Sequence, residues 1–165
     1  MSIHRFYDYF PISKVDPCTL YSHYFSFFVH PDLHSLGITH TDLKLDNVLL
    51  VNSEFQSVPL ENAPVKARLV LKSSEIRLID FGCAVFEGDY HRKVVSTRPY
   101  RAPEIVSGAG WSHPCDVWSA GCNLAELLTS GEIFPTEDGT DDLEHLAMME
   151  IVLGRIPDQL VRASR

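Results

Sequence analysis

The chain has 165 residues, enough for one domain, and its 22 acidic and 14 basic side chains give a formal net charge of −8. This balance argues against binding a nucleic acid through a basic face; it suits a basic protein partner, although ordinary solubilising surface charge explains it as well. The sequence has no C-x-x-C pair to suggest a zinc site, no N-terminal signal peptide, and no apolar stretch long enough to cross a membrane.

Residues 1–34 differ in pattern from the rest of the chain. They carry Pro11, Pro17 and Pro31 among scattered aromatic residues, with no sustained helical period. Because proline lacks the N–H donor and clashes with the preceding turn, Pro31 would break a long helix in this stretch. We interpret the segment as either a start unrelated to the domain that follows or a divergent N-terminal extension.

Two short motifs are the most informative feature. Residues 40–47 read His-Thr-Asp-Leu-Lys-Leu-Asp-Asn, Asp-Phe-Gly follows at 80–82, and apolar, strand-like runs stand beside them at 48–51 and 76–79. The first motif resembles the catalytic loop of a protein kinase, and the second resembles its later metal-binding motif. Because Asp-x-Lys alone also occurs in solvated turns, the order and context of both motifs carry this interpretation.

These motifs supply the groups that phosphoryl transfer requires. A carboxylate must accept the proton of the substrate hydroxyl, and positive charge must lie over the phosphates. Asp42 is the candidate general base, and Lys44 is the candidate cation facing the transferred phosphoryl group of ATP. Asn47 and Asp80 are candidate ligands of Mg²⁺, which prefers oxygen ligands. ATP and Mg²⁺ are therefore the implied cofactors.

The region between the motifs is longer than a simple hairpin requires. The pattern predicts a strand at 48–51, a proline-containing loop at 52–66, a strand at 67–72 and, after a turn, another strand at 75–79. We expect an inserted hairpin or loop within 52–74. A loop of this length inside a compact domain is usually either functional or disordered.

A buried helix is predicted after Trp111. Ser112 can cap it, Pro114 fits its first turn, and Gly131 is expected to end it. Apolar residues cover more than one stripe of this helix, and a helix apolar on nearly all sides is normally buried.

A second helix is predicted over 142–153. Asp141 and Glu144 have the spacing of a capping box, and Gly154 marks the stop. Four apolar residues are expected to share one face of this helix: Leu143, Leu146, Met149 and Leu153.

The cysteines suggest a reduced protein. Cys115 and Cys122 lie on the first predicted helix and are expected in the core. Cys83 directly follows the Asp-Phe-Gly motif and is expected to border the nucleotide pocket, either as a reactive thiol or as a small packing residue.

Three further motifs extend the kinase resemblance. Ala-Pro-Glu at 102–104 closes a segment that resembles a kinase activation segment, and residues 116–122 resemble the long central helix of the C-terminal lobe. Residues 144–150, Glu-His-Leu-Ala-Met-Met-Glu, match nearly all of the signature of LAMMER (CLK-like) dual-specificity kinases, which have Arg where this chain has Ile151. The chain resembles these kinases over about residues 35–158.

The resemblance implies an α+β fold over residues 35–165: a mainly helical, kinase-like C-terminal lobe (C-lobe) with small β-hairpins and with the N-terminal lobe absent. It implies ATP- and Mg²⁺-dependent phosphorylation of Ser and Thr, and also of Tyr, in proteins. Arginine/serine-rich splicing factors are the implied substrates, in the nucleus or, alternatively, in the cytoplasm. We expect a monomer that binds a basic protein substrate and contacts neither nucleic acid nor membrane directly.

Parts of a whole kinase are missing from the pattern. No Gly-rich loop and no strand with a phosphate-binding Lys can be placed before His40, and Lys14 lacks an apolar strand around it. Because positioning is most of what a kinase contributes, we expect a catalytic-lobe fragment that is inactive and marginally stable. The alternatives are a pseudokinase-like binding module and a truncated gene product without a stable fold.

The residue before Asp42 bears on regulation. Kinases that need a phosphorylated activation segment generally grip the phosphate with an Arg at that position, and this chain has Thr41. We therefore expect activity to be independent of such phosphorylation. Ser96 and Thr97 are either modification sites or part of the wall that seats the substrate.

The resemblance also implies an ion pair for Glu104 of the Ala-Pro-Glu motif, with an Arg late in a kinase C-lobe. Within this chain we expect Glu104 to face either water or a substitute cation, for which the candidates are Arg155, Arg162 and Arg165.

Overall fold

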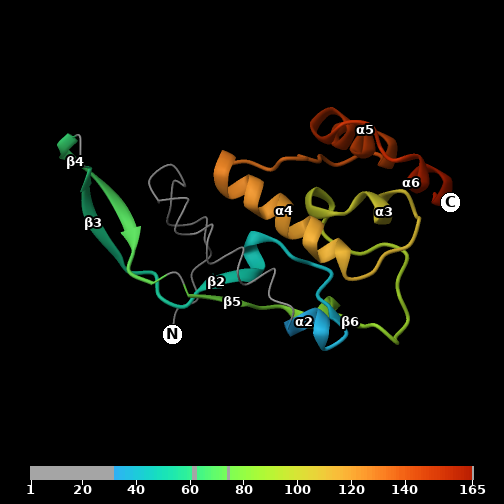
Figure 1. Cartoon of the computed structure of the whole chain (residues 1–165), viewed down its shortest axis with the longest axis horizontal. Coiled ribbons are helices and arrows are strands. Elements are labelled where there is room, and N and C mark those ends of the chain that lie inside the picture. The colour runs from blue at the N-terminus through green and yellow to red at the C-terminus, as the bar shows by residue number, and fades with distance from the viewer. Residues whose placement is uncertain (1–31, 61–62, 74, 165) are drawn as a thin grey trace.

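The computed structural model describes residues 32–60, 63–73 and 75–164 (Figure 1). The expectations for residues 1–31, including Lys14 and Pro31, and for Arg165 lie outside the described residues.

The fold is α+β, as expected, with small antiparallel sheets beside a set of helices (Figure 1). The sheets pair β1 (Ile38–Thr39) with β6 (Val85–Phe86), β2 (Val48–Leu50) with β5 (Ile76–Leu78), and β3 (Phe55–Leu60) with β4 (Ala63–Leu71). The helices are α2 (Asp32–Ser35), α3 (Pro103–Val106), α4 (Pro114–Thr129), α5 (Asp142–Leu153) and α6 (Asp158–Ala163), with 3₁₀ turns η3 (Leu45–Asn47), η4 (Phe81–Cys83) and η5 (Arg98–Tyr100). None of the described helices is long and apolar enough to span a membrane.

The β3–β4 hairpin extends away from the helices (Figure 1). It begins earlier than expected, because β3 occupies much of the stretch predicted as a loop over 52–66. The predicted loop is therefore wrong over β3. Pro59 is tolerated in this two-stranded ribbon, where the register shifts between Pro59 and Leu60. An ion pair between Lys72 and Glu54, 2.8 Å from Nζ to Oε2, closes the base of the hairpin.

Helix α4 begins at Pro114, as predicted, but its ends differ in detail. The residue before the first turn is His113, and no side chain caps the helix there. At the other end Ser130, not Gly131, adopts the left-handed conformation, with φ of 63°. The N–H of Ser130 donates to the carbonyl of Glu126 at 2.8 Å, so the carbonyl at the helix end is satisfied without a glycine.

Within the described residues, α4 is not buried on all of its apolar sides. Val117 and Leu128 are 55% and 54% exposed. The buried face carries polar residues instead, together with Cys115, Cys122 and Leu127: Asp116, Ser119, Asn123 and Glu126. This polar face lies against the catalytic loop and η5, whose backbone groups it binds, as described below.

Helix α5 has the predicted bounds and caps. The Asp141 carboxylate accepts the N–H of Glu144 at 2.7 Å, and Gly154 ends the helix with φ of 88°. Its buried face was predicted only in part, because Leu143 and Leu153 are 76% and 63% exposed.

The buried positions of α5 are His145 and Met149, one turn apart. Met149 joins a core cluster with Phe134, which stacks on Trp118 at a centroid distance of 5.7 Å. Cys122 belongs to this cluster and Cys115 to a neighbouring one, so both cysteines lie in the core as predicted.

His145 should make stability depend on pH. Its side chain is fully buried, and neither ring nitrogen has a hydrogen-bond partner among the described residues. Burial, reinforced by the charges of Arg98 and Arg101, lowers its pKa to about 4. In an unfolded chain the pKa is about 6.5, so the unfolded state takes up this proton first as the pH falls. Stability should therefore be complete above about pH 6.5 and decline toward pH 4, by on the order of 3 kcal/mol.

Chemical denaturation at pH 7 and pH 5, compared with the variant His145→Leu, measures this contribution. The comparison is needed because burial raises the pKa of Glu126 to about 7. Glu126 contributes in the opposite sense, since stability from its protonated form is lost as the pH rises from about 4.5 to 7. Equal pH dependence in wild type and variant would contradict the assignment to His145.

Candidate active site

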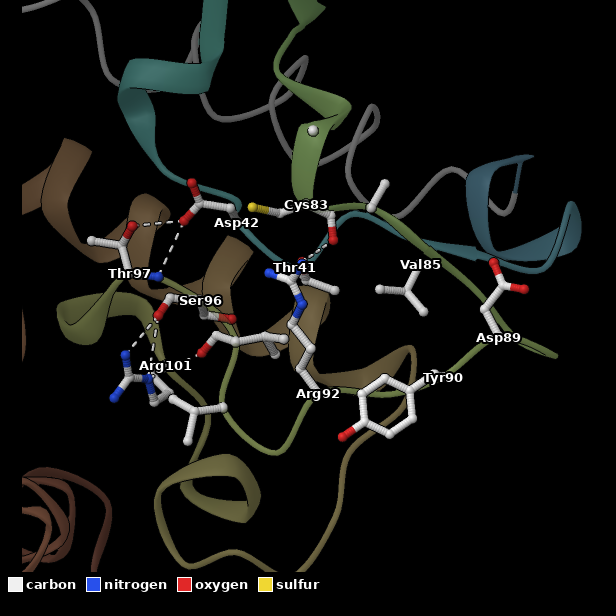
Figure 2. A pocket seen from close by; sticks show the side chains of 14 residues that line it. Thr41, Asp42, Cys83, Val85, Asp89, Tyr90, Arg92, Ser96, Thr97 and Arg101 are labelled. Atoms are coloured by element: carbon white, nitrogen blue, oxygen red, sulfur yellow. Dashed lines mark hydrogen bonds between the residues drawn. The ribbon is translucent and has the colours of Figure 1, made fainter.

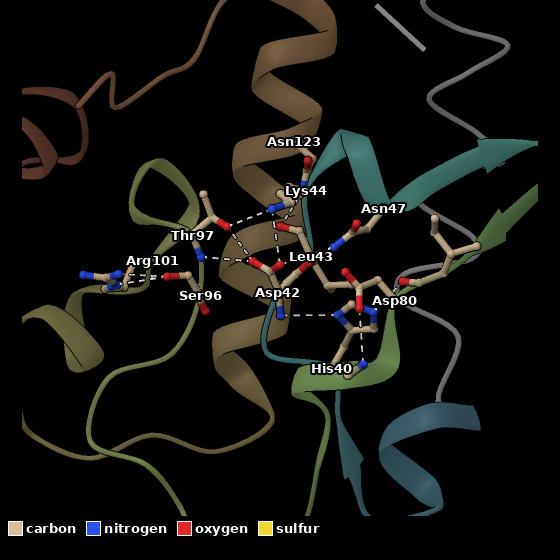
Figure 3. A network of polar contacts seen from close by, with 12 residues as sticks. His40, Asp42, Leu43, Lys44, Asn47, Asp80, Ser96, Thr97, Arg101 and Asn123 are labelled. Atoms are coloured by element: carbon tan, nitrogen blue, oxygen red, sulfur yellow. Dashed lines mark hydrogen bonds and ion pairs between the residues drawn. The ribbon is translucent and has the colours of Figure 1, made fainter. Parts of the chain in front are cut away.

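Asp42 lies at the centre of a compact polar network (Figure 3). Its Oδ1 accepts two hydrogen bonds from Thr97, from the backbone N–H at 3.1 Å and from the hydroxyl at 2.6 Å. Lys44 Nζ lies 3.3 Å from the other oxygen of Asp42 and donates to the Thr97 hydroxyl at 3.2 Å. The catalytic loop and the segment before η5 are thus joined at the predicted base.

These contacts decide the charge of Asp42. Burial alone would raise the pKa of its carboxyl, but the hydrogen bonds from Thr97 and the charge of Lys44 outweigh burial and hold the pKa below its usual range. The side chain is therefore an ionised proton acceptor at neutral pH, held in one orientation.

Asn47 and Asp80 stand at the ends of neighbouring strands. The N–H of Ile79 donates to the carbonyl of Asn47 at 2.9 Å, which continues the β2–β5 pairing and brings the two predicted metal ligands to one edge (Figure 3). Asp80 is exposed and left-handed, with φ of 62°, and its Oδ1 accepts the N–H of Gly82 at 3.3 Å.

The donor set fits a hard cation. The described hydrogen bonds of the Asn47 side chain use only Nδ2, which donates to the carbonyl of Asp42 at 2.8 Å and leaves the amide oxygen for a ligand. Within the described residues no group of three His, Cys, Asp or Glu side chains forms a metal site by itself. An ion held by Asn47 and Asp80 would take its other ligands from phosphate oxygens and water, as Mg²⁺ commonly does.

His40 connects the two motifs. Its Nε2 lies 3.1 Å from the carbonyl of Ile79, and its Nδ1 accepts the N–H of Asp42 at 3.3 Å. The Asp42 bond places the ring proton on Nε2, which then donates to Ile79. The ring also packs edge-on against Phe81 at 4.9 Å. The fully buried imidazole therefore fixes the catalytic loop relative to the Asp-Phe-Gly motif.

Side chains of helix α4 hold the backbone of the catalytic loop in place. The Asp116 carboxylate accepts the N–H of His40 at 2.8 Å and the N–H of Thr41 at 2.9 Å. Thr41 is left-handed, with φ of 67°, a conformation that costs free energy for a side chain with a branched Cβ. Asn123 donates to the carbonyl of Leu43 at 3.1 Å. Sequence reasoning placed this helix but assigned no role to Asp116 or Asn123.

A cavity of about 590 Å³ opens beside Asp42 (Figure 2). The catalytic loop forms one wall and the segment 89–97 forms another, and in this view the Arg92 side chain runs toward Thr41. The hydroxyl of Thr41 donates to the carbonyl of Cys83 at 2.8 Å within this lining. Cys83 is exposed and faces this cavity.

The segment before the Ala-Pro-Glu motif is held by its own cation. Arg101 donates to the carbonyl oxygens of Val95 and Ser96, at 3.0 Å and 2.9 Å. This arrangement fixes Ser96 in a left-handed conformation, with φ of 68°. Arg101 is thus already engaged with backbone oxygens, and independence from phosphorylation stays a prediction.

Glu104 has no cation partner among the described residues. It is partly buried, and burial raises the pKa of its carboxyl. Two of the proposed partners point elsewhere: Arg155 pairs with Asp158 at 2.9 Å, and Arg162 Nε donates to the Asp158 carbonyl at 3.3 Å. Neither of these two candidates is the partner of Glu104, because Asp158, the first residue of α6, engages both arginines locally.

Fold and site together define the catalytic lobe of a protein kinase, in which Asp42, Lys44 and Asn47 lie in one polar network and Asp80 lies at the adjacent strand end. Residues 31–162 match the protein kinase domain family, and the chain belongs to that family. Its relatives are LAMMER-type, CLK-like kinases, which confirms the resemblance seen in residues 144–150.

The relatives are similar over most of this chain but are much longer. The chain is 55% identical to the dual specificity protein kinase lkh1 of Schizosaccharomyces pombe, over 81% of this chain and 19% of that protein. It is 48% identical to the serine/threonine-protein kinase AFC1 of Arabidopsis thaliana and 46% identical to the dual specificity protein kinase CLK2 of Homo sapiens, in each case over 81% of this chain. These alignments cover 30% and 26% of the two relatives.

A solved structure agrees with this assignment. The crystal structure of a kinase domain superposes with a TM-score of 0.76 and 36% sequence identity, over 90% of this chain and 44% of that one.

Proposed function

We propose that the protein of which this chain forms the catalytic lobe transfers the terminal phosphoryl group of ATP to Ser and Thr side chains, and to Tyr, of proteins. The observation that carries this proposal is the joint placement of Asp42, Lys44 and Thr97, with carboxylate, ammonium and hydroxyl in mutual contact. A substrate hydroxyl seated beside Thr97 would present its proton to Asp42, and Lys44 would stabilise the negative charge that moves with the phosphoryl group.

Asn47 and Asp80 are the residues that would hold Mg²⁺, whose charge, when it is bound, neutralises the phosphate oxygens during transfer. The residues of this chain contribute by orienting the catalytic loop and Asp42. His40 and Asp116 fix the backbone on either side of Thr41, so Asp42 needs no rearrangement to accept a proton.

Basic, arginine/serine-rich proteins such as splicing factors are the proposed substrates. Support comes from the net charge of −8 and from the similarity to CLK-like kinases. With such substrates we place the protein in the nucleus, acting as a monomer.

The test is phosphoryl transfer to a synthetic Arg-Ser repeat peptide, with mass spectrometry of the product. It should be run on the chain alone and on the chain joined to the nucleotide-binding lobe of a related kinase. Transfer by the joined protein that requires Mg²⁺ supports the proposal. Peptide binding without any transfer by the joined protein would instead favour the pseudokinase-like binding module.

Thr97 should contribute to this reaction through its hydroxyl. Thr97→Ala removes the 2.6 Å bond to Asp42 and the contact with Lys44, and should lower kcat of the joined protein by roughly 10- to 100-fold. Thr97→Ser keeps the hydroxyl and should stay within a few-fold of wild type. Ser96→Ala is the matched control, because the neighbouring Ser96 hydroxyl has no partner among the described residues. Equal losses in Thr97→Ala and Ser96→Ala would contradict this role.

A further inference from the structure

An ion pair joins the segment beside Asp42 to the helix that carries the LAMMER signature. Arg98 Nη2 lies 2.8 Å from Asp142 Oδ1, between η5 and the first turn of α5. The Arg98 side chain is 27% exposed and that of Asp142 is 64% exposed, so the pair lies at the surface. Exposed ion pairs of this kind contribute little to folding stability. This pair matters instead for the net charge beside Thr97, because Asp142 carries the charge opposite to that of Arg98.

The position of Arg98 follows from the active-site network. Arg98 directly follows Thr97, whose N–H and hydroxyl both bind Asp42. A substrate residue whose hydroxyl reaches Asp42 would lie against Thr97, the chain neighbour of Arg98. Charges interact over about 8 Å at physiological salt, so only the nearest flanking residues would experience this guanidinium.

Two other ionisable residues in this part of the fold, Arg101 and His145, do not neutralise Arg98. Arg101 is itself a cation, and it is held on the backbone oxygens of Val95 and Ser96. His145 is buried without a hydrogen-bond partner among the described residues, and the charge of Arg98 disfavours its protonation. Nε of Arg98 is also buried without a partner there, so Asp142 provides the described anionic contact of this guanidinium.

We infer that Asp142 is a specificity-determining residue: by neutralising Arg98, it allows a basic segment of a protein substrate to lie beside Thr97. This inference rests on the proposed function and assigns a cause to its substrate preference. Asp142 is placed for this role by the cap of α5, where Asp141 fixes the helix start through the N–H of Glu144 at 2.7 Å. Without Asp142, the cation of Arg98 would repel the flanking arginines of such a substrate and attract acidic ones.

The experiment measures peptide binding to the full chain by fluorescence anisotropy, and it needs no phosphoryl transfer. The probes are two labelled peptides, each with one Ser, flanked by Arg in one and by Glu in the other. Asp142→Asn should weaken binding of the Arg peptide by about two- to five-fold and strengthen binding of the Glu peptide. Adding Arg98→Gln to this variant should restore the wild-type preference. Both effects should shrink at high salt, which a purely structural defect would not do.

Glu144→Gln is the matched control, since it removes the same charge from the same turn of α5 without touching the ion pair. The inference is overturned if this control behaves like Asp142→Asn, if the double variant behaves like the single one, or if the wild-type chain does not prefer the Arg peptide. If the joined protein transfers phosphate but Asp142→Asn leaves the peptide preference unchanged from wild type, this inference alone is refuted. The expected binding pattern without transfer would refute only the proposed enzymatic activity.

Discussion

Replacing Asp42 with Asn is expected to lower the turnover of the chain joined to a nucleotide-binding lobe by about two to four orders of magnitude. The amide cannot take up the proton of the substrate hydroxyl. It also exchanges one acceptor oxygen for an NH₂ group in a network built to donate to a carboxylate, from Thr97 on one side and Lys44 on the other. The loss should appear in kcat with a smaller effect on KM, because the proton moves only in the chemical step.

Asp46→Asn provides the control for this prediction. Asp46 lies on the same loop, within η3, and is exposed to solvent. Its substitution removes an equal charge close to the site and should change turnover by less than about three-fold. If Asp42→Asn left turnover unchanged, Asp42 could not be the base; if both variants lost activity equally, the effect would belong to the local field of the loop.

The candidate reacting groups could be predicted from the sequence because their spacing is local. Asp42, Lys44 and Asn47 lie on one loop, and Asp80 ends a strand that pairs with the strand following that loop. A short motif fixes such positions without knowledge of the packing. Thr97 was considered only as a modification site or a wall for the substrate, because its bond to Asp42 spans 55 positions and leaves no local pattern.

The polar face of α4 was missed for a different reason. Apolar periodicity predicts which side of a helix is buried only when burial is driven by apolar contacts. Here the buried face satisfies backbone groups of other segments, so its polar residues are buried and Val117 is exposed. A signal was present, since four polar residues recur at helical spacing on one face: Asp116, Ser119, Asn123 and Glu126. Polar periodicity of this kind indicates a helix that supports loops.

Removing the Asp116 carboxylate should be the most damaging change outside the reacting groups. In Asp116→Ala the N–H groups of His40 and Thr41 lose their shared acceptor in a buried position. Each buried, unpaired N–H costs about 1–3 kcal/mol, so we expect a loss of roughly 2–6 kcal/mol in the free energy of unfolding. Thr41 would also lose the bond that holds its left-handed conformation, and relaxation there would displace the adjacent Asp42.

The two consequences can be separated by experiment. Chemical denaturation of the chain measures the stability loss, while kcat of the joined protein, assayed well below its melting temperature, measures the displacement of Asp42. We expect kcat to fall by about 100-fold, the usual effect of misplacing a catalytic group by about 1 Å. Val117→Ala, at the next position of α4 and 55% exposed, is the control and should change stability by less than about 0.5 kcal/mol. A folded Asp116→Ala variant with wild-type kcat would show that the loop keeps its active geometry without this carboxylate, and that Asp116 contributes to stability alone.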